Sequence, residues 1–453
     1  MPLQRRSSLP AKPSLAFVLL CALFIVLLVA GGASRADASG QIIVRAMAWG
    51  MLIVAILFGS RPAMRRMGMP GMALAGAIFL VLIQLVPLPP SLWEALPSRA
   101  ILGGTGSGEV WRPVSMVPGA TWNALSSLVV PCVVLLLAVM MREEEQERLL
   151  AVLLTLVGTS ALVGLLQFSG AGFMNPFVND TPGQVSGLFA NRNHFALFLA
   201  LGCLIASVWA TRSGAQRWRL SAAAGLVLLF LLTILTTGSR AGMLLGLVAL
   251  GLALLMSRHA LRKVTRGGPR WLLPALVTGA ILILAFFVTL FVAADRAVSI
   301  NRAVSVDGNE DMRVRGLSTV LDMIHRYFPV GSGFGGFDPM FRMHEPFDLL
   351  KITYFNHAHN DYLEIALDGG IVALLLLGIA MLWWGTRMIR VWRKVEAGTI
   401  AQLGSTMLLL VLIASFVDYP VRTPMIMALT ALAGLWLGEQ RQKAGAALPH
   451  QDQ

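Results

Sequence analysis

Long apolar runs recur from one end of the chain to the other, and they constrain its fold more than any other feature. A helix that crosses a bilayer needs roughly 18 or more predominantly apolar residues, because the lipid core offers no partner for backbone polar groups. Twelve runs approach or exceed that length. They cover residues 15–33, 42–59, 72–89, 122–141, 149–168, 193–210, 220–237, 241–256, 272–294, 363–386, 400–417 and 422–438. The sequence therefore predicts an all-α polytopic integral membrane protein with about 12 transmembrane helices.

The chain is strongly basic, with a net charge of +13, but its basic residues lie in short loops between the apolar runs. Membrane proteins fix their orientation in this way, so the charge does not indicate nucleic acid as a partner. Loops on one side of the membrane hold 22 Lys and Arg residues, and loops on the other side hold 14. The positive-inside rule then places both termini in the cytoplasm. The long polar segment 295–362 is extracytoplasmic, which in a bacterium means periplasmic.

The N-terminus and the cysteines suggest no further site. The first apolar run follows three basic residues, as in a signal peptide, but its length favours a retained signal anchor. The three cysteines fall inside apolar runs and indicate neither a disulfide framework nor a metal site. They are Cys21, Cys132 and Cys203.

Titratable residues crowd into the stretch 356–364, at the end of the long polar segment. Asn360 or Asp361 suits the N-cap of the following helix, and Asp361 and Glu364 have the spacing of a capping box. His357 and His359 are not needed for a cap. A neutral imidazole beside a carboxylate can act as a general base near neutral pH. No third metal ligand stands at a standard spacing, so the stretch does not predict a metal site.

Arginines form further candidate sites on the same side of the membrane. Arg240 lies in a very short turn, 236–242, where a cation either reaches the lipid headgroups or pairs with an anion. The neighbouring Ser, Thr and Gly residues favour an anionic ligand. Arg313 and Arg315 are ordinary surface charges by default, although their guanidinium forks also suit a pyrophosphate. The glycine-rich run 331–337 lacks the Lys and Ser/Thr of a phosphate-binding P-loop and is interpreted as a flexible turn.

A last candidate group precedes the sixth apolar run, where asparagines could simply cap a helix. Arg192 and His194 stand there beside Asn191 and Asn193, and they could line an outer cavity.

Several of these motifs together resemble the O-antigen ligase and O-antigen polymerase superfamily. They are NHAHNDYLEIALDGGI, RVRGLSTVLDMIHRYFPVGSGFGGF, TGSRAG and GLFANRNHFA. The resemblance covers roughly residues 180–385. It implies an all-helical, GT-C-like glycosyltransferase of the bacterial inner membrane. Such enzymes take glycan from an undecaprenyl-pyrophosphate carrier at the periplasmic face, with no cofactor and without metal.

The resemblance also implies roles for individual residues. The turn arginine of the family falls on Arg240, and its loop arginine falls on Arg313 or Arg315. Its essential histidine falls on His359, with His357 as a further substrate-binding residue. The turn reads Ser-Arg-Ala-Gly where many members have Ser-Arg-Gly, and alanine is small enough that no loss is expected.

In the chemistry that follows from the resemblance, arginines hold the pyrophosphate as it leaves. His359 accepts the proton of the acceptor hydroxyl, and Glu364 or Asp361 orients the histidine ring. A single displacement inverts the anomeric configuration. The acceptor would be a glycan or the lipid A core, and membrane lipid would surround the protein. Polymerisation, ligation to lipid A core and protein glycosylation all remain open.

The chain is thereby divided into three parts. Residues 1–179 hold N-terminal transmembrane helices, 180–385 the ligase- or polymerase-like core, and 386–453 the C-terminal helices and a cytoplasmic tail. A transporter or flippase of an anionic or lipid-linked substrate is the alternative function. Charged residues are scarce inside the runs, whereas a transport path usually needs some near the midplane. A sensor is a third possibility, but the chain shows no output domain.

Overall fold

The computed structural model describes residues 12–99, 110–179, 181–212, 216–266, 308–350, 355–393 and 399–439, with four single positions between 279 and 289. Helices dominate this part of the chain, and its two short strands, β1 (Pro87–Leu88) and β2 (Arg112–Pro113), pair antiparallel. The helices are α1 (Leu15–Ala30), α2 (Ser39–Phe58), α3 (Gly68–Gln84), α4 (Pro90–Glu94), α6 (Pro118–Ser127), α7 (Val129–Met140), α8 (Glu145–Phe168), α9 (Arg192–Arg212), α10 (Arg217–Thr236), α11 (Arg240–Arg266), α13 (Gly308–Tyr327), α14 (Phe337–His344), α15 (Asp361–Arg393), α16 (Thr399–Ala414) and α17 (Pro424–Gly438). The 3₁₀ turns are η1 (Met64–Met67), η2 (Phe347–Leu349) and η3 (Pro420–Arg422).

The predicted spans coincide with these helices, apart from 272–294, which lies almost wholly outside the described residues. Eight helical segments of the described chain are long and apolar enough to cross a membrane. Three shorter apolar helices, α1, α16 and α17, pack among them. The prediction of an all-α polytopic membrane protein is confirmed.

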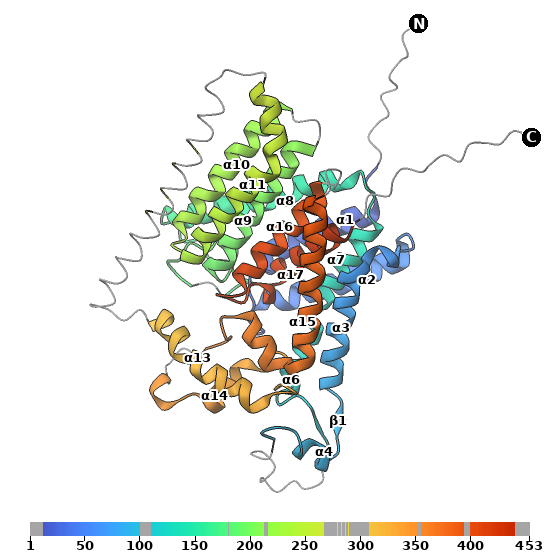
Figure 1. Cartoon of the computed structure of the whole chain (residues 1–453), viewed down its shortest axis with the longest axis vertical. Coiled ribbons are helices and arrows are strands. Elements are labelled where there is room, and N and C mark those ends of the chain that lie inside the picture. Colours follow the sequence, from blue (N-terminus) through green and yellow to red (C-terminus); the bar gives the residue numbers. More distant parts are fainter. Residues whose placement is uncertain are drawn as a thin grey trace, which may run out of the picture.

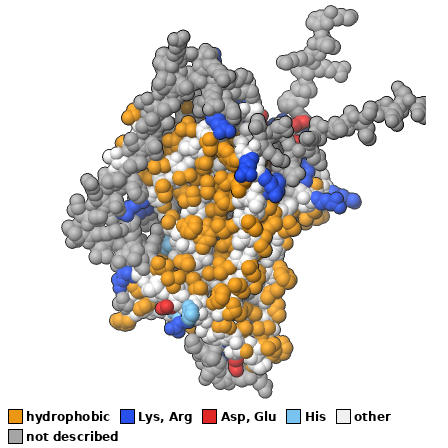
Figure 2. Space-filling view, viewed as in Figure 1, with side chains coloured by type: hydrophobic (Ala, Val, Ile, Leu, Met, Phe, Trp, Pro, Cys, Tyr) orange, Lys and Arg blue, Asp and Glu red, His pale blue; other side chains and the backbone are white. Residues whose placement is uncertain are grey.

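The helices form a bundle (Figure 1), and α9 is the most buried of its described candidate spans. Most of α9 is buried against α8, α10, α11 and α16. Helices α2, α3 and α15 instead turn large apolar side chains outward, and these form a continuous apolar belt (Figure 2). Lipid rather than water suits such a surface, because water would make this exposed apolar area costly.

A smaller layer of α4, α6, α13 and α14 covers one end of the bundle (Figure 1). Its own apolar core includes Val320, Tyr327, Phe341 and Phe355. Helices α9, α11, α15 and α17 all begin at this end, which is called the site end below.

Helix α15 is interrupted about two and a half turns after its first residue. Gly370 has φ 57° and ψ −146°, a conformation that is essentially restricted to glycine. The glycine-rich segment 331–336 packs against this break. The N–H groups of Ser332 and Gly333 donate to the carbonyls of Leu367 and Asp368, and the N–H of Ile371 donates to Pro329. The segment predicted as a flexible turn is therefore held by main-chain hydrogen bonds to α15.

We expect Gly370→Ala to destabilise the protein by about 1–3 kcal/mol, because alanine would hold a strained backbone. Its Cβ would also lie 2.0 Å from the carbonyl oxygen of Pro329. Thermal unfolding in detergent measures the effect. Gly378→Ala is the matched control in the same helix, since nothing lies within 4 Å of its added Cβ. Equal melting temperatures of the two variants would contradict the prediction.

Candidate active site

Three segments that are distant in sequence meet at the site end, namely 191–194, 356–364 and 418–423. The first begins α9, the second leads into α15, and the third joins α16 to α17. The turn before α11 is tied to them, since the hydroxyl of Ser239 donates to Oδ1 of Asn193 at 2.7 Å. The cap of α15 is Asn360, whose side-chain oxygen accepts from the N–H groups of Tyr362 and Leu363. Asp361 is thus left for another contact.

His357 is held by Glu364. Its Nδ1 lies 2.8 Å from Oε1 of Glu364, and the other carboxylate oxygen accepts the N–H of Ala358 at 2.9 Å. The Glu364 side chain is fully buried. A carboxylate only accepts, so Nδ1 of His357 carries a proton and its Nε2 remains available to a substrate.

His359 is held by a different carboxylate, that of Asp418. Its Nδ1 lies 3.3 Å from Oδ1 of Asp418, so neither Glu364 nor Asp361 orients the ring of His359. The backbone of His359 has φ 51°, in the left-handed region that few non-glycine residues adopt. Strain of this kind collects where a side chain must be held in one position.

Asp418 is the centre of a hydrogen-bond network. Its Oδ2 accepts from the amides of Asn191 at 3.0 Å and Asn193 at 2.7 Å. His194 lies with Nε2 at 3.7 Å from Oδ1, and its Nδ1 is 2.8 Å from the hydroxyl of Thr423. Burial alone would raise the pKa of the Asp418 carboxyl, but His194 and His359 hold this pKa well below its ordinary value. Asp418 is therefore an anion at working pH.

Tyr419 gathers the three histidines. Its ring centroid lies 4.2 Å from that of His357, 4.9 Å from that of His359 and 5.2 Å from that of His194. The ring of Tyr419 thus contacts the imidazoles of both histidine–carboxylate pairs and holds the two pairs next to each other.

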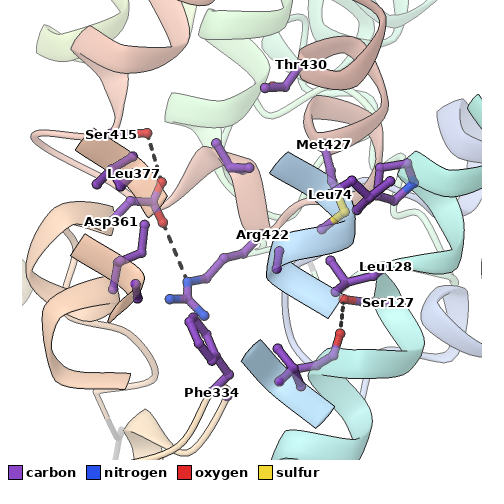
Figure 3. Close-up of a pocket in the computed structure, with 18 of the residues that line it drawn as sticks. Leu74, Ser127, Leu128, Phe334, Asp361, Leu377, Ser415, Arg422, Met427 and Thr430 are labelled. Atoms are coloured by element: carbon purple, nitrogen blue, oxygen red, sulfur yellow. Dashed lines mark hydrogen bonds and ion pairs between the residues drawn. The ribbon is translucent and has the colours of Figure 1, made fainter. Parts of the chain in front are cut away.

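Arg422 binds a cluster of three carboxylates on α15. Its guanidinium lies 3.5 Å from Asp361, 3.2 Å from Glu364 and 3.4 Å from Asp368. Figure 3 shows Arg422 reaching from the turn before α17 toward Asp361 and Phe334, and Asp361 also accepts the hydroxyl of Ser415 at 2.9 Å. Burial alone would lower the pKa of the guanidinium, but the carboxylates raise it, so Arg422 stays charged.

Two cavities adjoin this cluster. The large cavity, of about 860 Å³, lies among α2, α3, α7, α15 and α17, and His357, Asp361 and Arg422 line its polar end. Apolar side chains line most of the rest, including Leu74, Leu128 and Met427 in Figure 3. The small cavity, of about 340 Å³, is polar. Its lining includes Asn179, Thr181, Asn191, His194 and Tyr419, and both cavities share Ser34, Arg35 and Asn356.

Residues 224–378 match the family model of the O-antigen ligase. This match covers about a third of the chain and supports a relation to the O-antigen ligase and polymerase superfamily. The matched domain supports glycan transfer of the ligase or polymerase type in general. No curated protein matches the chain. The matched residues run from α10 into α15, so this O-antigen ligase domain contains Arg240, Arg315, both histidines of the 356–364 stretch and Glu364.

The predicted arginines with described side chains lie around the candidate site, and none of them lines either cavity. Arg240 is the first residue of α11 and is partly buried, and Arg192 is the first residue of α9. Nη1 of Arg192 lies close to Gly238, so both arginines stand at the 237–240 turn. Arg315 is exposed on α13, one residue before Gly316, which packs near Phe355. The side chain of Arg313 lies outside the described residues.

Sequence reasoning missed four residues of the candidate site: Asp368, Asp418, Tyr419 and Arg422. A signal for two of them was present, because Asp418 and Arg422 stand at the two ends of a very short connection between apolar runs. The same feature had singled out Arg240. Asp368 follows the start of a predicted span by only a few residues and would have counted as a charge inside the membrane.

Within the described part of the chain, no three His, Cys, Asp or Glu side chains are grouped as metal ligands would be. The chemistry that the site residues themselves offer is an oriented imidazole for proton transfer and guanidinium groups for an anion.

Proposed function

We propose that the protein is an inner-membrane glycosyltransferase that acts in surface polysaccharide assembly. It moves glycan from an undecaprenyl-pyrophosphate carrier to an acceptor hydroxyl at the periplasmic face. The observation that carries the proposal is the pair of histidine–carboxylate contacts around Tyr419. His357 lines the large, mostly apolar cavity, and Tyr419 lines the small polar one. A lipid-linked sugar needs both environments, and its transfer needs a base.

Each residue has a distinct role in this proposal. His359, oriented by Asp418, accepts the proton of the acceptor hydroxyl, and the hydroxyl oxygen attacks the anomeric carbon. His357, oriented by Glu364 on the large cavity, binds the donor. Arg240 and one loop arginine, Arg313 or Arg315, stabilise the charge that develops on the departing pyrophosphate.

Asp361 has a positioning role, because it holds Arg422 beside Glu364. Arg192 and His194 fix the edge of the small cavity, which accommodates the acceptor. One displacement inverts the anomeric carbon, and the guanidinium groups take the place that a metal ion has in other phosphate sites. Chelators should therefore leave activity unchanged, whereas loss of activity restored by zinc would contradict this part.

The orientation follows from the distribution of charge. Arginines cluster at the end of the molecule away from the site. They lie at the last turns of α9 and α15, at the start of α10 and in η1. By the positive-inside rule this end faces the cytoplasm. The site end is then periplasmic and both termini are cytoplasmic. A reporter fused at residue 340 should read as periplasmic, and a cytoplasmic signal would overturn this topology.

The experiment that tests the function uses cells from which the gene is deleted, complemented with His359→Ala or Arg240→Ala at matched expression. We expect both variants to lose surface polymer. Accumulation of single lipid-linked repeat units would identify a polymerase, and accumulation of long lipid-linked chains would identify a ligase. His325→Ala and Arg326→Ala are matched controls, since both side chains are exposed on α13. Full polymer in the first two variants would reject the assignment.

A further inference from the structure

Arg45 is a basic residue of the large cavity, and all of its described hydrogen-bond partners are uncharged side chains. It lies in the second turn of α2 and lines the cavity. Its Nη1 donates to Oδ1 of Asn123 at 2.6 Å and to the hydroxyl of Ser126 at 2.8 Å, and its Nη2 donates to Gln41 at 3.3 Å. Its Nε is buried without a hydrogen-bond partner among the described residues.

The other charged residues of this cavity already have partners of opposite charge. Arg35 makes two contacts with Asp37, at 3.0 and 2.6 Å, and Arg422 binds the carboxylates of α15. Asp338 binds Arg342. Arg45 therefore brings a positive charge to the cavity that no described carboxylate balances. A cation at this depth in a membrane protein is costly unless an anion joins it.

The shape of the cavity indicates what carries that anion. Along α15 its lining runs from Asp361 to Trp384, which at 1.5 Å per residue is at most about 35 Å, since the break at Gly370 lies between them. The hydrocarbon core of a bilayer is about 30 Å thick. Along α3 the lining extends from Met69 to Val81 and is apolar throughout. An acyl chain of a bilayer phospholipid reaches only to the midplane, so a longer hydrocarbon is needed to fill the cavity.

We propose that Arg45, held in place by Asn123 and Ser126, binds the phosphate of a polyprenyl lipid whose chain occupies the large cavity. This site is separate from Arg192 and Arg240, neither of which lines the cavity. The inference deepens the proposed function and rests on it for the choice of a polyprenyl lipid. Asn123 and Ser126 direct the Nη1 edge of the guanidinium into α6, and the phosphate meets the Nη2 edge, whose contact with Gln41 is long at 3.3 Å.

The test is a binding measurement on the purified full chain by native mass spectrometry, with undecaprenyl phosphate and its uncharged counterpart undecaprenol as probes. We expect the wild type to prefer the phosphate by about tenfold or more, as for a charge-assisted contact. Arg45→Gln should abolish this preference and leave the affinity for undecaprenol unchanged. Repeating the comparison in an Arg240→Gln background removes any contribution of the other arginine site.

Two further variants protect the test against misfolding. Asn123→Asp keeps the shape of the contact at Oδ1 but places a carboxylate beside Arg45, so it should also abolish the preference while Arg45 is still present. Arg35→Gln removes a cation of the same cavity that Asp37 already neutralises, and it should keep most of the preference.

The outcomes separate this proposal from the proposed function. An unchanged preference in Arg45→Gln, or an equal loss in Arg35→Gln, would overturn the assignment of Arg45 and leave the glycan-transfer test untouched. Phosphatidylglycerol is the competing source of a lipid phosphate. If it binds as tightly as undecaprenyl phosphate and is equally sensitive to Arg45→Gln, the cavity holds a bilayer phospholipid and the polyprenyl assignment is wrong.

Discussion

Replacing Asp418 by asparagine is expected to lower the rate of glycan transfer by about 10²- to 10⁴-fold, the range for loss of a general base. Asp418 accepts hydrogen bonds at both oxygens, from His359 and Tyr419 at one and from two asparagine amides at the other. An amide accepts at one end only, so at least one of these donors loses its partner. His359 then loses both its orientation and the anion that stabilises its protonated form.

The pH profile distinguishes this role from a structural one. The Asp418 carboxylate favours the imidazolium form of His359, whereas a general base must be neutral to accept a proton. In Asp418→Asn the acid limb of the residual activity should therefore move to lower pH. Asp37→Asn is the control, because that carboxylate is exposed and pairs only locally with Arg35 in the described structure. A lower rate with an unmoved acid limb would show that Asp418 does not act through His359.

Replacing Arg422 by methionine should destabilise the protein by about 3–5 kcal/mol, the usual effect of removing one partner from a buried ionic cluster. The side chains of Glu364 and Asp368 are fully buried, and no other described cation contacts Asp368. Methionine fills much of the volume but leaves the carboxylates without their counter-charge. Thermal unfolding in detergent provides the measurement.

Two comparisons identify the cause of that loss. Adding Asp368→Asn to Arg422→Met removes one uncompensated charge and should recover part of the melting temperature. Arg342→Met breaks an exposed ion pair with Asp338 and should change stability by about 0.5 kcal/mol or less. If Arg342→Met were as damaging as Arg422→Met, the cluster on α15 would not be the reason.

The spans could be predicted because hydropathy is a local property. A helix in lipid must be apolar along its length, so run length alone located nearly every described transmembrane helix. The break at Gly370 could not be predicted in this way. It depends on the segment 331–336, which supplies hydrogen-bond donors to the carbonyls that the break releases. The sequence pattern through 363–386 is that of one continuous helix.

The site was predicted in its composition but not in its pairing. His357 meets Glu364 seven residues away, within reach of local reasoning. His359 instead meets Asp418, 59 residues later, across two helices. Nothing in the local pattern distinguishes one histidine from the other, and only the return of α16 to the site end brings Asp418 to its partner. The sequence offered Asn360 or Asp361 as the N-cap of α15. Asn360 caps the helix, and Asp361 instead binds Arg422.

The hydrogen bonds between the segment 331–336 and α15 have a consequence for substrate traffic. They join main-chain atoms, and the carbonyl of Ser332 also accepts from the N–H of Met116 before α6. The covering layer is thus fastened to the wall of the large cavity and travels with it. We expect exchange of lipid to require α3 and α15 to part within the bilayer. The viscosity of the surrounding membrane, rather than a hinge in the covering layer, would then set how quickly a new lipid enters the large cavity.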